Sequence, residues 1–369
     1  MKLVLSYDAS HLTSDYLEQA LNKSAVNTSF NISTTQYFSQ DRVKKVFNAA
    51  QKSGSLSADF NGAQLDSSEL GNAVKSAGTK VSISVNTAQS TPISTLLNAL
   101  ELAGDTKTFS AEFNGAQLTG DNLEKAISAA GNKSSISLNT AQNLSSSHLE
   151  KVLSVAGSSK NISLDFNGAQ LDPQETIEAV KKAGEKTSIS VNTAQSLSKQ
   201  TLLDLLKAAA NSKILSADFN GAQLTISTFT EALKAAGSKT ALSINTAQSI
   251  SKSNLLNLAS LAGTTKTLAM EFNGSQTNVA DLIDVIKKSG TKTSIRVNTA
   301  QNLNSDDLVD VINAAGSSKN LSLTFDGSRL TGNNLQRAVS AAGSKTTVIV
   351  TNAYRTPINV ILNIVDTAG

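Results

Sequence analysis

A six-residue phrase recurs along this chain at one fixed interval. Its copies begin at Phe60, Phe113, Phe166 and Phe219 as FNGAQL, at Phe272 as FNGSQT and at Phe325 as FDGSRL. The step is 53 residues each time, without insertion or deletion. A fixed period of this size is typical of a solenoid or a closed array, in which each unit packs only against its neighbours.

A second phrase, VNTAQ, interleaves with the first and follows the same interval. Its copies begin at Val85, Leu138, Val191, Ile244 and Val297. Stepping by 53 residues also finds worn copies at both ends, at Tyr7, Ile32 and Val350. The sequence therefore predicts one domain spanning residues 1–369, built from seven double units or fourteen halves.

Each half has the pattern of a strand followed by a helix. Residues 162–166 alternate apolar and polar side chains, which is the period of a half-buried strand. Asp172, Pro173 and Glu175 then form a helix start, with Asp172 as N-cap. Gly184 is expected to stop the helix in a left-handed conformation. Strands joined by helical crossovers run parallel, so the halves predict an α/β fold with a parallel sheet.

The segment SLDFNGAQL, Ser163–Leu171, resembles the LDLSGNQL segment of leucine-rich repeats. Two alternating strand–helix repeats are similar to the ribonuclease-inhibitor class of that family. The resemblance implies a right-handed horseshoe solenoid, with the sheet on the concave face and helices on the convex face. It also implies a strand with an unpaired edge at the C-terminal end.

One departure from the family concerns the turns. The column that usually holds Asn or Cys contains alanine, as at Ala169, whereas Asn167 and Gln170 occupy flanking columns that recur in most units. We interpret these amides as ladders that satisfy backbone groups in stacked turns. The alternative is a periodic amide surface that grips a repetitive ligand.

Composition narrows the class of protein. The net charge is +3, cysteine is absent, and no apolar run reaches the length of a signal peptide or a membrane span. This predicts a cytoplasmic protein, or one exported without a cleaved signal into a host cell. His11 and His148 have no partners at metal-ligand or triad spacing, and no phosphate loop is present. We therefore expect no enzyme activity, no metal and no cofactor.

Two charged columns have both a structural and a functional interpretation. A row of carboxylates precedes the phenylalanines and should lie on the concave face: Asp59, Glu112, Asp165, Asp218 and Glu271. It is either a solvated face or a mildly acidic binding surface. Lysines recur just beyond the expected helix C-termini, as at Lys160 and Lys186. They either complement helix dipoles or form a basic rim for phosphate-rich surfaces.

The repeat breaks near the C-terminus, where end caps and a contact surface are equally good explanations. The candidate contact residues are Arg296, Asp326, Arg329, Ile349, Tyr354 and Arg355. The strand Val348–Val350 is apolar on both faces, as a strand covered on both sides would be. We expect a second copy or another protein to cover this end, so a homodimer through it is one prediction.

These observations favour a non-catalytic protein-binding scaffold with a repetitive polar concave surface. A bacterial effector acting on a host protein fits the Lys-, Asn- and Ser-rich style. The alternative is a structural protein that self-associates through its uncapped ends. Nucleic acid is not an expected partner, because no aromatic residues interleave with the lysines.

Overall fold

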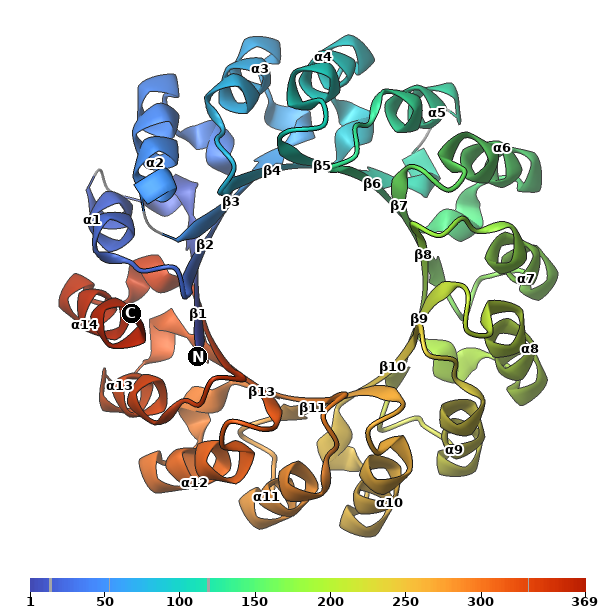
Figure 1. Ribbon diagram of the computed structural model, residues 1–369, viewed down its shortest axis with the longest axis vertical. Helices are drawn as coiled ribbons and strands as arrows, with labels where there is room; N and C mark the ends of the chain where they lie inside the picture. The colour runs from blue at the N-terminus through green and yellow to red at the C-terminus, as the bar shows by residue number, and fades with distance from the viewer. Residues whose placement is uncertain (13–14, 53, 118–119, 331) are drawn as a thin grey trace.

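The computed structural model describes all residues except 13–14, 53, 118–119 and 331 (Figure 1). In this described part, the odd strands are β1 (Lys2–Asp8), β3 (Ser55–Asn61), β5 (Thr108–Asn114), β7 (Asn161–Asn167), β9 (Ile214–Asn220), β11 (Thr267–Asn273) and β13 (Asn320–Asp326). The even strands are β2 (Thr28–Ser33), β4 (Val81–Asn86), β6 (Ser134–Asn139), β8 (Thr187–Asn192), β10 (Thr240–Asn245), β12 (Thr293–Asn298) and β14 (Thr346–Thr351).

One α-helix follows each strand. The first seven are α1 (Tyr16–Lys23), α2 (Gln40–Lys52), α3 (Ser67–Ser76), α4 (Ile93–Ala103), α5 (Gly120–Ala129), α6 (Ser146–Ala156) and α7 (Pro173–Lys182). The others are α8 (Lys199–Ala209), α9 (Ile226–Ala235), α10 (Lys252–Ala262), α11 (Val279–Lys288), α12 (Ser305–Ala315), α13 (Gly332–Ala341) and α14 (Ile358–Ala368). The predicted α/β repeat of strand–helix halves is confirmed.

The sheet closes on itself. Each strand pairs in parallel with its neighbours in the chain, and β1 pairs with β14, placing Val4 beside Ile349. Figure 1 shows the strands on the inside of a ring and the helices outside, with both termini in the same sector. The predicted open horseshoe with unpaired edges is therefore wrong. We call the junction of β14 with β1 the seam.

A stagger between strands explains the closure. Asp59 pairs with Ser84, and Ser84 pairs with Ser110, two residues short of Glu112 at the repeat-equivalent position. Each double unit thus slips by two residues, which gives fourteen residues of stagger around fourteen strands. Equal strand number and stagger tilt the strands by about 36°, as in the eight-stranded α/β barrel, and tilted strands can close. The seam keeps this register, because Val350 pairs with Leu5 as Val85 pairs with Ala111.

The alternation within each strand sorts the two faces of the sheet. In β3, Leu56, Ala58 and Phe60 are buried against the helices, whereas Ser57 and Asp59 are half-exposed. The inner face is therefore polar, and the apolar core lies between the sheet and the helices. Sheet inside and helices outside were predicted correctly.

Local signals at the helix ends had mixed outcomes. Asp172 caps α7 as predicted, since its carboxylate accepts from the Glu175 backbone N–H at 3.0 Å. Gly184 does not have the predicted left-handed conformation; Gly157, which follows α6 in the preceding unit, has a positive φ of 50°. Gly184 is needed for close packing instead, because a Cβ there would overlap the carbonyl group of Gly157.

Candidate binding site inside the ring

The tilt brings repeat-equivalent side chains of alternate strands to one level around the axis. We call one level the acidic layer; it contains Ser6, Asp59, Glu112, Asp165, Asp218, Glu271 and Thr324. The adjacent level, the serine layer, contains Asn31, Ser84, Ser137, Ser190, Ser243, Arg296 and Ile349. The predicted row of five carboxylates is thus an arc that runs from β3 to β11 around the inside of the ring.

The inside of the ring is open to solvent rather than packed. All five carboxylates are half-exposed, and Arg296 is exposed although it lies in the middle of β12. Fourteen strands about 4.8 Å apart at this tilt make a backbone ring about 26 Å across. Allowing about 5 Å of side chain on each wall leaves a bore about 16 Å wide. An α-helix with its side chains is about 10–12 Å wide and fits such a bore.

Neutral donors hold the carboxylates in place. The hydroxyls of Ser84, Ser190 and Ser243 donate to the three aspartates on the preceding strands, Asp59, Asp165 and Asp218 respectively. The glutamates reach further, and the side-chain amides of Asn139 and Asn298 donate to Glu112 and Glu271. In these units an aspartate therefore accepts from a serine on the next strand, and a glutamate accepts from an asparagine there.

No cation neutralises this arc within the described residues. None of the five carboxylates forms an ion pair with a lysine or arginine there. Burial raises the pKa of Asp59 above its ordinary value, although the hydroxyls of Ser84 and Ser57 donate to it. The arc can therefore attract a cationic group that enters the bore.

The sector near the seam has a different character. Arg296 lies beside Glu271 in the sheet, but Glu271 accepts from Asn298 and the guanidinium stays exposed in the bore. Val4 and Ile349 lie side by side across the seam, and both are half-buried. The strand that carries Ile349 is thus paired with the chain's own first strand, while the Ile349 side chain stays partly exposed in the bore. The sheet edge on which the homodimer was predicted does not exist.

The other predicted contact residues gather at the rim where the strands end. Tyr354 and Arg355 belong to the 3-10 helix η11 (Ala353–Arg355), and the Arg355 guanidinium lies 5.5 Å from the Tyr354 ring centroid. The His11 ring stacks on Tyr354 with centroids 5.2 Å apart, so Tyr354 contacts the first unit of its own chain. The structure thus brings these residues together across the seam, without a second copy.

Asp326 at this rim is firmly bonded. Asn352 donates to its carboxylate at 3.1 Å, the Ser328 backbone N–H donates at 3.0 Å, and Arg329 lies 3.9 Å away. Burial on its own would raise the pKa of Asp326, but these donors and the guanidinium lower it below its ordinary value. The carboxylate is therefore fixed as an anion within the rim.

Sequence reasoning missed the contributions of the first unit. The segment from Tyr7 was treated as a worn copy at a distant end, yet His11 in this segment stacks on Tyr354, and Val4 just before it pairs with β14. A signal was available, because His11 and Tyr354 both stand in the glutamine columns that face each other across other junctions. Aromatic residues in both columns are consistent with a direct contact between the first and last units.

The amide columns are structural, as predicted. The Gln142 carbonyl oxygen accepts from the Asn167 backbone N–H at 3.1 Å, and its amide donates to Gln170 at 3.4 Å. Asn167 in turn accepts from the Ala169 N–H at 3.0 Å and the Thr193 hydroxyl at 2.9 Å. These amides bond to neighbouring turns, which gives the columns a structural role.

The lysine columns also have a structural role. Lys160 donates to the Ser128 carbonyl at 3.1 Å, at the end of α5, and Lys186 donates to the Ser159 carbonyl at 3.2 Å. These contacts satisfy carbonyls at and beyond helix C-termini, where a cation also complements the helix dipole.

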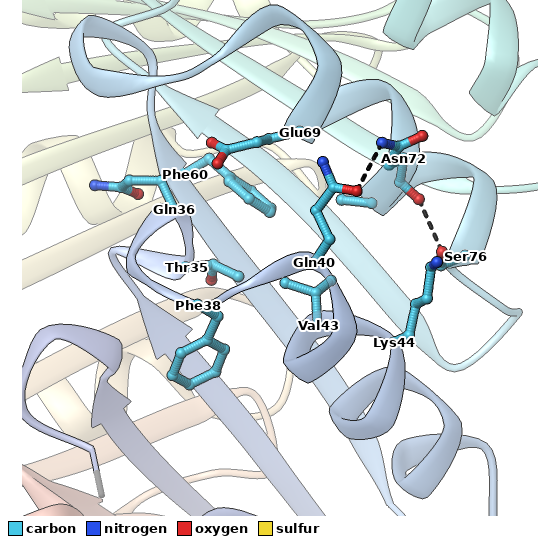
Figure 2. A pocket seen from close by; sticks show the side chains of 11 residues that line it. Thr35, Gln36, Phe38, Gln40, Val43, Lys44, Phe60, Glu69, Asn72 and Ser76 are labelled. Carbon is cyan, nitrogen blue, oxygen red and sulfur yellow. Dashed lines mark hydrogen bonds between the residues drawn. The ribbon is translucent and has the colours of Figure 1, made fainter. Parts of the chain in front are cut away.

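Cavities outside the ring differ in size, and one of about 230 Å³ lies between α6 and α7, lined by Leu149, Leu153 and Lys182 among others. Figure 2 shows one between α2 and α3, near Phe60, where Asn72 donates to Gln40 at 3.1 Å. Its volume of about 10 Å³ could hold at most a single water molecule. The part of the chain that the structure describes contains no cluster of three or more His, Cys, Asp or Glu side chains suited to a metal ion. No helix in the described ranges is long and apolar enough to cross a membrane.

Comparisons with known proteins show weak structural likeness only. No protein-family model matches the sequence, and no curated protein sequence matches it. The leucine-rich repeat-containing protein LegL7 from Legionella pneumophila is 13% identical, with a TM-score of 0.36, 98% of this chain and 97% of that chain covered.

Two further solved structures are similar to this chain over different shares of its length. The yeast Rad7 and Elc1 complex is 14% identical with a TM-score of 0.49, covering 93% of this chain and 83% of that chain. The HpcH/HpaI aldolase from Desulfitobacterium hafniense is 10% identical with a TM-score of 0.29, covering 52% and 87%. Likeness at this level says nothing about activity or partners.

Proposed function

We propose that this protein is a non-catalytic scaffold that binds a cationic protein segment inside its ring. The observation that carries the proposal is the acidic layer, in which five carboxylates face the open bore and form no ion pair with a lysine or arginine among the described residues. The resemblance to leucine-rich repeats supports a protein as the partner. An effector role in a host cell is one setting in which such binding would serve.

Closure limits what the partner can be. An open horseshoe can embrace a globular protein, but a bore about 16 Å wide admits only a helix, a loop or an extended segment. A helix with Lys or Arg on several faces could approach carboxylates on five strands at one level. Attraction at this distance is strong at low salt and is screened at high salt.

Three sets of side chains in the bore have different roles in binding the segment. The acidic layer attracts the segment, Arg296 donates to an acidic group on it, and Val4 with Ile349 contacts an apolar side chain. The preferred segment is therefore mainly basic, with one apolar and one acidic position on the side that faces the seam.

The test is binding of a labelled, lysine-rich helical peptide of about twenty residues, followed by fluorescence anisotropy. The lumen variant combines Asp59→Asn, Glu112→Gln, Asp165→Asn, Asp218→Asn and Glu271→Gln. A matched control removes five outer carboxylates through Glu150→Gln, Glu178→Gln, Glu231→Gln, Asp284→Asn and Asp310→Asn. We expect at least a tenfold loss of affinity in the lumen variant and less than twofold in the control. Equal losses would show that the peptide binds outside the ring and would refute the proposal.

A further inference from the structure

The two faces of the ring carry opposite charge. Every helix runs in the same direction, because every strand is parallel and each is followed by one helix. The loops that lead from a helix to the next strand all lie on one face, which we call the lysine face. In the described residues these loops contain eleven lysines against Asp105 and Glu185, a net charge of +9.

The opposite face, which we call the cap face, contains the loops that lead from strands into helices. Together with the first four residues of each helix, its described residues include eleven acidic and five basic side chains, a net charge of −6. The cause is local, since carboxylates stabilise helix N-termini and lysines stabilise C-termini. The consequence for the whole ring is an acidic face and a basic face.

The exposed lysines keep bonding capacity for a partner. Lys133 and Lys239 donate to the Thr106 and Ser212 carbonyls at 3.2 and 3.3 Å, yet both side chains are exposed. An ammonium group has three donors, so two remain on each. Equivalent exposed lysines recur at Lys186, Lys292 and Lys345.

We propose that the ring binds a second copy of itself head to tail, with the lysine face of one ring on the cap face of the next. The opposite charges of the two faces favour a second copy as the partner, and the ring shape of both faces allows one to lie on the other. Both faces follow the same closed ring of units. Lysines of one ring can therefore meet the acidic helix starts of the next, which belong to α1, α2, α3, α5, α7, α11 and α12. A head-to-tail contact of this kind does not close, and it produces open coaxial stacks.

Such a contact must be sensitive to salt. Each exposed ion pair is weak, and the interface depends on many of them acting together. Charges separated by more than about 8 Å are largely screened at 0.15 M ionic strength. Stacks should therefore form at low ionic strength and dissociate as salt is added.

Sedimentation velocity over a concentration series at about 20 mM and about 500 mM salt tests the inference. We expect large species at low salt and monomer at high salt. The lysine-face variant carries Lys133→Glu, Lys186→Glu, Lys239→Glu and Lys292→Glu. It should be monomeric at both salt concentrations. The control Lys44→Gln, Lys125→Gln, Lys151→Gln, on outer helix faces, should behave as wild type.

A charge exchange shows whether the two faces meet. The cap-face variant carries Asp41→Lys, Asp121→Lys, Glu175→Lys and Asp306→Lys. It should also be monomeric alone, because both its faces are then basic. Mixing it with the lysine-face variant should restore salt-sensitive association. A wild-type monomer at low salt, or association that survives both salt and the lysine-face variant, would overturn the inference.

Discussion

The seam and an interior junction such as that between β6 and β7 have the same backbone register but different side-chain bonds. The interior junction has the Gln142–Gln170 amide bond and the Lys160 contact with the end of α5. At the seam the amides are replaced by the His11–Tyr354 stack, and Met1 stands in the lysine column. Closure therefore depends on strand pairing and on bonds specific to the seam: the Tyr16 hydroxyl donates to the Thr356 carbonyl, and Lys23 lies 3.7 Å from Asp366.

The glycine columns show the same contrast in packing. Interior junctions have glycine at the Gly184 position. A Cβ would overlap the backbone of the preceding loop at five of them, Gly131, Gly184, Gly237, Gly290 and Gly343. The equivalent residue at the seam is Ala25, and a Cβ built on its neighbour Gly369 would lie 3.2 Å from the Ala25 Cβ. At this position the seam has room for a methyl group that interior junctions such as the one at Gly184 exclude.

The largest expected effect comes from this difference. Gly184→Ala should lower the free energy of unfolding by about 3 kcal/mol, because overpacking against backbone cannot be relieved by a rotamer change. Ala25→Gly at the seam should change it by less than about 1 kcal/mol. Urea denaturation of both variants measures the two values. Equal effects would mean that the seam is as tightly packed as the interior.

An intermediate effect is expected from the aromatic stack. Tyr354→Ala should destabilise the protein by about 1 kcal/mol, since it removes a ring pair at the seam. Hydrogen exchange resolves where the loss occurs. Amides of β1 and β14 should exchange faster in the variant, whereas those of β7 should not change. Uniform acceleration throughout the sheet would contradict a separate role for the seam.

The smallest effect should come from repairing a ladder. Among the residues that the structure describes, the Gln301 side-chain nitrogen is buried without an acceptor, and Arg329 stands where other units have a glutamine that accepts. Arg329→Gln should restore this bond and stabilise the protein by about 0.5–1 kcal/mol. Thermal unfolding of the variant measures the gain, and Arg329→Ala is the control that cannot accept. A gain in the alanine variant as well would point to relief of arginine strain rather than a new bond.

Much of the local structure could be predicted from the sequence, whereas closure could not. Strand alternation, the Asp172 cap and the amide ladders follow from residue types and spacing. The stagger is two residues per double unit, and a slip of two leaves every side chain on the same face of a strand. The hydrophobic pattern is therefore identical for an open and a closed sheet. For this reason a second copy or another protein was predicted to contact Ile349 and Tyr354, whereas the first unit of the same chain contacts them.

The stagger has a consequence for how such a ring could change size. Each double unit brings two strands and two residues of slip, so adding or removing a unit leaves the strand tilt unchanged. Rings of six or eight units would close through the same junctions, with a bore that differs by about 4 Å per unit. Duplication or loss of one 53-residue stretch would thus change the width of the segment that fits in the bore, while the contacts between neighbouring units stay the same.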